Sequence, residues 1–123
     1  MTTMTPANGA RGEATVKLGD VTVVLAAEME DLARLSDVLG NPTMPDLFKR
    51  LMGGEVRAAL WMFRLFAVRG AGPEGELDAE AAGAAAAAAY RLDDVGAIAA
   101  AVEILFAALT RKQPAKERPE KNV

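Results

Sequence analysis

Residues 14–25 read ATVKLGDVTVVL, two runs of largely alternating apolar and polar side chains joined by Gly19-Asp20. Alternation with a period of two places the apolar side chains of each run on one face of a β-strand. A glycine at the first position of a two-residue link suits a type II′ turn, because this turn requires a positive φ there. The pattern predicts a β-hairpin. Since an isolated hairpin is marginally stable in water, its apolar face should lie against helices or pair with a partner's strand.

Helical periodicity replaces the alternation after the hairpin. Apolar residues recur every three or four positions up to Gly40, which predicts a helix over roughly residues 27–39. Thr43 is placed to cap a second, shorter helix, with Asp46 three residues later as in a capping box. This second helix should end before Gly53-Gly54, where two glycines interrupt the pattern.

The most apolar stretch covers residues 55–69, in which large side chains occupy most of the circumference of a helix. Such a helix is enclosed by its neighbours. Because burying one large apolar side chain contributes about 1.5–3 kcal/mol, we expect this helix to dominate the stability of the core. Residues 70–75 contain three glycines and a proline and are predicted to form a loop.

Two more helices are expected in the C-terminal part of the chain. Asp78 should cap a helix that includes the alanine run and extends to Tyr90, because alanine has the highest helix propensity. The small side chains of this helix permit close packing against a neighbour. Asp93 or Asp94 should cap a last helix, in which apolar residues recur at helical spacing up to about residue 110.

These elements together predict an α+β fold, mainly α, with an N-terminal β-hairpin followed by about five helices in a single small domain. The domain should span residues 13–110. Residues 1–12 lack apolar periodicity, and residues 111–123 are charged and contain prolines. Both ends are therefore expected to be disordered, the second as a basic tail.

The composition disfavours most enzyme chemistry. The chain of 123 residues contains neither histidine nor cysteine, which removes the usual general base, the thiol nucleophile and the common zinc ligands. We therefore expect a protein that is not an enzyme and uses no cofactor or metal. The N-terminus has no apolar segment typical of a secretory signal, and the most apolar stretch is interrupted by Arg57 and Arg64, which favours a cytoplasmic protein without a membrane span.

Charge is distributed unevenly along the chain. Residues 1–110 carry 9 basic and 15 acidic side chains, whereas residues 111–123 carry 5 basic and 2 acidic ones. Affinity for nucleic acid depends on clustered lysine and arginine, so the acidic body argues against a nucleic-acid partner.

Two further patterns occur in binding sites but have simpler interpretations here. Residues 70–75 follow a predicted helix and lack the Lys-Ser/Thr ending of a phosphate-binding loop. The carboxylate pairs Glu30-Asp31 and Asp93-Asp94 suit a solvated helix face and a helix cap better than a cation site.

The candidate partner-binding residues belong to the second and third predicted helices. Phe48 and Met52 lie between glycine breaks, where a mobile flap would expose them, although such residues more often fill cores. Arg57 and Arg64 are seven residues apart, on nearly the same side of their helix. Each could reach a carboxylate of a partner, or its stem could cover the edge of the core. Trp61, between them, is an apolar group of the kind used at binding grooves.

The order of these elements resembles the small gene transfer agent proteins of α-proteobacteria, which belong with the tail assembly chaperones of long-tailed phages. The resemblance is a diffuse pattern over about 100 residues and contains no single diagnostic motif. The residues that carry it are Arg11-Gly12-Glu13, Ala14–Leu18, Gly19-Asp20, Val21–Leu25, the stripe Met29, Leu32 and Leu35 ending at Gly40, Leu47–Gly53, and Leu77–Glu80.

The resemblance implies a function in the assembly of phage-like tails. Such proteins bind and solubilise the apolar tape-measure protein and help recruit tail-tube subunits, without catalysis, and we expect a homo-oligomer. One alternative is a structural tube or connector subunit of a gene transfer agent or prophage particle, although a tube subunit should be mainly β. A second alternative is a small DNA-binding regulator that uses a helix from Arg57 to Arg69.

Overall fold

The N-terminal alternation forms the hairpin that the sequence predicts. In the computed structural model, which describes residues 12–110, β1 (Ala14–Leu18) pairs antiparallel with β2 (Val21–Leu25), with Leu18 opposite Val21. Gly19 has a φ of 65°, and among the described residues Asn41 is the only non-glycine with a positive φ. The turn therefore has its positive φ at the first central position alone, as a type II′ turn requires.

A second hairpin follows where the sequence predicts the end of a helix and then a loop. β3 (Ala67–Gly72) pairs antiparallel with β2, and β4 (Gly75–Leu77) pairs with β3, which completes a sheet of order β1-β2-β3-β4. The predictions of a helix through residue 69 and of a loop over residues 70–75 were therefore wrong.

Close packing explains why β3 contains Gly70, one of the glycines that led to the prediction of a loop. A methyl group added at Gly70 would come within 2.6 Å of the Thr22 carbonyl oxygen and 2.8 Å of the Ala82 side chain. Only a residue without a side chain fits at this point between β2 and the following helix. Because glycine is also common in loops, the sequence alone does not distinguish Gly70, which packs closely inside the fold, from a loop residue.

Five α-helices complete the part of the chain that the structure describes, and two of their predicted caps are present. The Thr43 hydroxyl accepts a hydrogen bond from the Asp46 N–H at 3.2 Å, and the Asp78 carboxylate accepts one from the Ala81 N–H at 2.9 Å. Asp94 instead accepts from the Arg91 N–H at 2.8 Å, inside a short 3₁₀ turn that precedes the last helix. The elements are α1 (Met29–Val38), α2 (Met44–Met52), α3 (Val56–Phe66), α4 (Ala79–Ala89), η2 (Leu92–Asp94) and α5 (Val95–Thr110).

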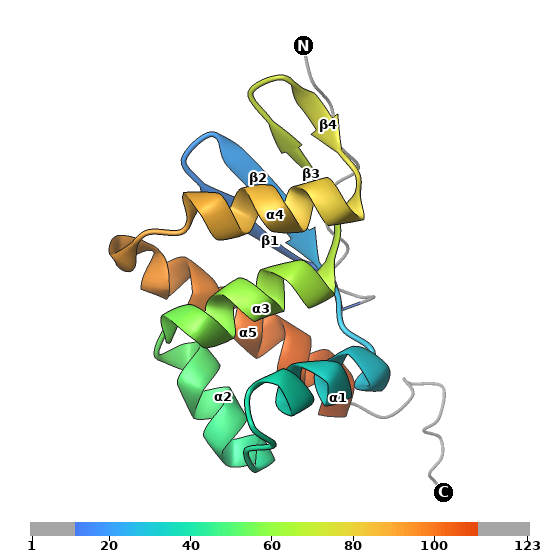
Figure 1. The fold of residues 1–123 in the computed structure, drawn as a ribbon, viewed down its shortest axis with the longest axis vertical. Helices are drawn as coiled ribbons and strands as arrows, with labels where there is room; N and C mark the ends of the chain where they lie inside the picture. The colour runs from blue at the N-terminus through green and yellow to red at the C-terminus, as the bar shows by residue number, and fades with distance from the viewer. Residues whose placement is uncertain (1–11, 111–123) are drawn as a thin grey trace, which may run out of the picture.

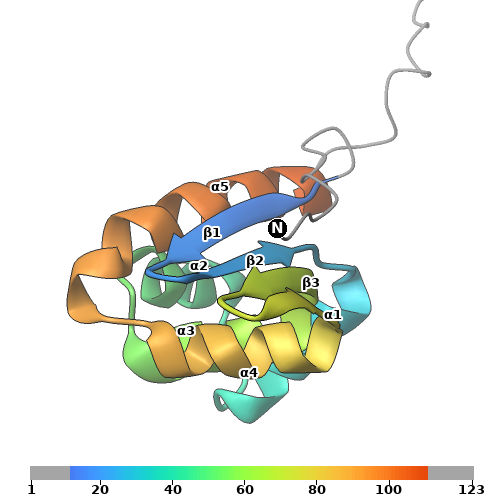
Figure 2. The same cartoon turned by 90° about the horizontal axis from the view of Figure 1, so that it is seen from above.

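The helices enclose one face of the sheet. α4 packs against β2 and β3, α5 runs beside β1, and α3 lies between α4 and α1 (Figures 1 and 2). α2 packs against α5, so α1 and α2 form the end of the molecule away from the hairpin turns (Figure 1). The largest fully buried side chains come from every layer and include Leu18, Leu25, Leu35, Leu47, Phe63, Phe66 and Ile98.

The result is an α+β fold that is mainly α, as predicted, with a four-stranded sheet in place of one hairpin. Within residues 12–110, no helix combines the length and the apolar character that crossing a membrane requires. The ends predicted to be disordered, residues 1–12 and 111–123, lie outside the described residues except for Gly12, which is buried.

Candidate partner-binding surfaces

Two of the apolar residues predicted to bind a partner lie on α2, the helix that packs against α5. Phe48 and Met52 are one turn apart on α2, and both are half-buried against the core. The ring of Phe48 meets that of Phe106 edge to face, with centroids 5.0 Å apart and an interplanar angle of 61°. Much of the surface of Phe48 is therefore used inside the molecule, where an edge-to-face pair is favourable.

An apolar pocket lies next to this aromatic pair, at the end of the molecule formed by α1, α2 and α5. Its volume is about 160 Å³, and Met29 and Met44 at its rim are 62% and 42% exposed. Flexible methionine side chains adapt to apolar groups of different shape. The residues that line the pocket are Met29, Leu32, Met44, Phe106, Leu109 and Thr110.

Sequence reasoning did not find this pocket. Met44 is one of several apolar residues of the kind used at binding grooves, and Met29 lies on the predicted stripe of the first helix. Neither position indicates that the last turns of α5 supply the remaining wall. Only the tertiary contact between α2 and α5 brings Phe106 and Leu109 to this place.

The other three predicted residues share the outer face of α3. Arg57, Trp61 and Arg64 are spaced by four and three residues, so their side chains leave the helix on one side. Both arginines are exposed and Trp61 is half-buried. The predicted residues thus form two groups rather than one site. Phe48 and Met52 lie on α2, where Phe48 packs against Phe106 of α5, and the other three lie on α3, which crosses in front of α5 (Figure 1).

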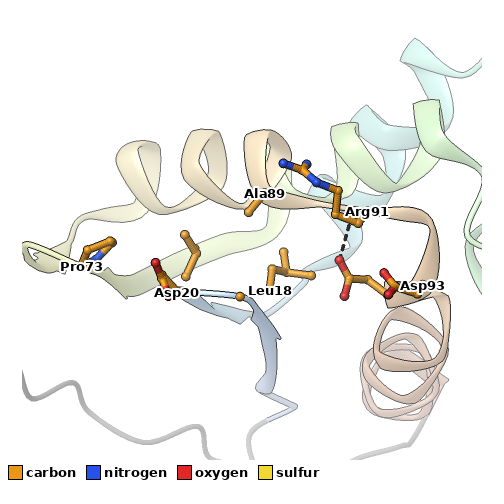
Figure 3. Close-up of a pocket in the computed structure, with 9 residues that line it drawn as sticks. Leu18, Asp20, Pro73, Ala89, Arg91 and Asp93 are labelled. Carbon is orange, nitrogen blue, oxygen red and sulfur yellow. Dashed lines mark hydrogen bonds between the residues drawn. The ribbon is translucent and has the colours of Figure 1, made fainter.

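A larger, open pocket of about 510 Å³ lies between the turns of the two hairpins and the connection from α4 to α5 (Figure 3). Its charged groups largely serve the fold: the Arg91 guanidinium donates to the carbonyls of Ala88 and Tyr90 at 3.1 Å, and Asp94 accepts from the Arg91 N–H. Figure 3 shows Asp20 and Asp93 on opposite sides of Leu18. Among residues 12–110, no three acidic, histidine or cysteine side chains are grouped as metal ligands.

A buried tyrosine links two connections of the fold. The Tyr90 hydroxyl donates a hydrogen bond to the Gly54 carbonyl at 2.9 Å, which ties the end of α4 to the turn between α2 and α3. Burial raises the pKa of Tyr90 above its ordinary value of 10.0, and the negative charge of Asp94 raises it further. The hydroxyl is therefore neutral near pH 7 and acts as a structural donor.

No protein-family model, curated protein or solved structure matches the chain. The resemblance to tail assembly chaperones stays a prediction that the residues from Arg11 to Glu80 carry. What the geometry offers is two separate surfaces: the apolar pocket between α1, α2 and α5, and the outer face of α3 with its two arginines and Trp61.

Proposed function

We propose that the protein is a non-enzymatic tail assembly chaperone of a phage or gene transfer agent. In this proposal it binds the tape-measure protein in the cytoplasm, helps recruit tail-tube subunits, and acts as a homo-oligomer. The sequence resemblance supports the class of protein. The apolar pocket with exposed methionines at its rim is the observation that supports binding of an apolar segment.

The chemistry of the pocket suits a helix with large apolar side chains. Leu32, Phe106 and Leu109 supply apolar walls, and the pocket volume of about 160 Å³ is of the size of one large side chain. Removing apolar surface from water is worth about 25 cal/mol per Å², so seating a leucine or phenylalanine here contributes to binding without any polar contact. Amphipathic helices bind grooves of this kind through such anchoring side chains.

The alternatives draw less support from the described residues. A tail-tube subunit should be mainly β, and this fold is mainly helical even with its second hairpin. For a DNA-binding regulator, the basic helix is shorter than the sequence suggests, because Arg69 lies on β3 and its guanidinium pairs with the Glu13 carboxylate at 2.8 Å.

Mass spectrometry of purified particles separates a chaperone from a tail subunit, since a chaperone should be absent from the finished particles or scarce in them.

Co-expression with the tape-measure protein of the same gene cluster tests the proposal. We expect a soluble complex, detected by pull-down and by size-exclusion chromatography with light scattering, that forms only when both chains are present. Met29→Lys with Met44→Lys places two charges at the rim of the pocket and should weaken the complex at least about tenfold, which corresponds to about 1.4 kcal/mol.

Leu92→Lys is the matched control, because Leu92 is 79% exposed and lies on η2, away from the pocket. It should leave the complex unchanged. If no complex forms, and the protein is found in finished particles, it is a structural tail subunit and the chaperone proposal is wrong.

A further inference from the structure

The outer face of α3 carries two positive charges at a defined spacing. Arg57 and Arg64 are seven residues apart on one helix, which places them two turns, or about 10.5 Å, apart along its axis. Trp61 leaves the helix between them on the same side. This arrangement places a half-buried aromatic ring, which also packs against the core, between two exposed arginine side chains.

These two arginines are not neutralised within the described part of the chain. The ion pairs among residues 12–110 use Arg34, Arg50 and Arg69, and neither Arg57 nor Arg64 has a carboxylate in salt-bridge range. Arg57 donates one hydrogen bond, from Nη2 to the Val38 carbonyl at 3.3 Å, and its other N–H groups remain available. These two positive charges lie on one helix face of a body that has 15 acidic and 9 basic side chains up to residue 110.

We infer that the outer face of α3 docks an acidic amphipathic helix of the partner protein. Such a helix would carry two carboxylates seven residues apart, matching Arg57 and Arg64, with apolar residues between them that pack on Trp61. Arginine donates two parallel hydrogen bonds to a carboxylate, and tryptophan and arginine are the residues that most often dominate binding energy at interfaces. The inference deepens the proposed function and rests on it for the identity of the partner.

Trp61 supplies a direct measurement, because it is the only tryptophan of the chain. The probe is a synthetic helical peptide with glutamates seven residues apart and leucines between them, compared with a peptide in which lysines replace the glutamates. Titration of the acidic peptide should change the Trp61 emission to saturation, and the affinity should fall at least about tenfold when salt rises from roughly 50 to 500 mM. No saturable change, or an equal change with the lysine peptide, overturns the inference.

Charge reversal tests the two arginines. The double variant Arg57→Glu with Arg64→Glu should lose the acidic peptide and bind the lysine peptide instead. Lys49→Glu, an exposed charge reversal on α2, is the control and should keep the wild-type preference. If the double variant does not fold, Arg64→Gln alone serves, since Arg64 makes no hydrogen bond within the described residues, and it should weaken the acidic peptide several-fold. Unchanged binding in these variants overturns the inference.

Co-expression separates this inference from the proposed function. A tape-measure complex that survives the charge reversal keeps the chaperone function and overturns the docking face on α3. Binding of the acidic peptide without any tape-measure complex keeps the docking face and overturns the function. A homodimer that the charge reversal dissociates would make a second copy the occupant, and displacement of the acidic peptide by duplex DNA would make nucleic acid the occupant. Either outcome would contradict the assignment to a partner helix.

Discussion

Helices α3 and α4 pack side by side and have opposite compositions. α3 contributes Met62, Phe63 and Phe66 to the core, all essentially fully buried. In α4, by contrast, nine of the eleven residues are alanine, and the other two are Glu80 and Gly83. Where the two helices meet, a methyl group on Gly83 would lie 2.7 Å from the Phe63 carbonyl oxygen. α3 fills the core with large side chains, whereas the small residues of α4 let the backbones of the two helices approach closely.

This difference shows that the stability of the two helices has different physical sources. α3 is stabilised by the apolar area that its side chains bury. α4 buries little area per residue and relies on the helix propensity of alanine, on the Asp78 cap, and on its fit against α3 and β3. Substitutions should therefore destabilise the protein for different reasons: on α3 by removing a large side chain, and on α4 by adding one.

The largest effect is expected from Phe63→Ala on the α3 side. Phe63 is 0% exposed, and removing its ring leaves a cavity that the alanine side chains of α4 cannot fill. The free energy of unfolding should fall by about 3–5 kcal/mol. Chemical denaturation followed by circular dichroism measures this loss. A loss below about 1 kcal/mol would mean that α3 is not the main source of core stability.

The next effect is expected from Gly83→Ala on the α4 side, where adding a group does the damage. Alanine favours a helix over glycine by about 1 kcal/mol, but the new methyl group would overlap the Phe63 backbone, so a net loss of about 1–3 kcal/mol should remain.

Gly96→Ala on α5 is the matched control for this substitution. Nothing lies within 4 Å of a methyl group at Gly96, so the same chemical change should raise stability by up to about 1 kcal/mol. If both variants were stabilised, close contact would not be the reason for glycine at position 83.

The smallest effect is expected from Tyr90→Phe, at the point where α4 ends against α3. The ring of Tyr90 packs edge to face on Phe63 with centroids 5.8 Å apart, and phenylalanine keeps this contact while losing the hydrogen bond to Gly54. The loss at neutral pH should be about 1 kcal/mol.

The same tyrosine predicts a pH dependence. Its pKa is raised in the folded state, so its neutral form contributes stability that is present below about pH 10, the ordinary pKa of tyrosine, and is lost as the pH rises above it. Wild-type stability should fall more steeply above pH 10 than that of Tyr90→Phe. Ultraviolet titration of tyrosinate reports on Tyr90 alone, because the chain has one tyrosine. Equal slopes for the two proteins would contradict the raised pKa.

The sequence predicts α4 and the first hairpin correctly because their signals are local. The Asp78 cap and the alanine run lie in one segment, and alternation with Gly19-Asp20 marks β1 and β2. The second hairpin has no such signal. Val68 and Arg69 continue the helical pattern of α3, and Gly70 is required by contact with Thr22 and Ala82, which are distant in the sequence.

The candidate surfaces differ in the same way. Arg57, Trp61 and Arg64 share a face because one helix carries them, so their juxtaposition could be predicted from spacing. The apolar pocket is assembled from three helices between Met29 and Thr110, and no local pattern indicates it. For Phe48, the sequence predicts its position on a helix but not its pairing with Phe106, because the two residues are distant in the sequence.

The close contact between Gly12 and α5 has a topological consequence. A methyl group at Gly12 would come within 2.6 Å of the Ala108 side chain, so the backbone enters the fold beside the place where α5 ends at Thr110. Replacing residues 1–11 and 111–123 by a short flexible link between these two points would close the chain into a ring, which could be reopened at the exposed turn between β3 and β4. A circularly permuted chain that begins at this turn is therefore expected to keep the same packing of its helices and strands.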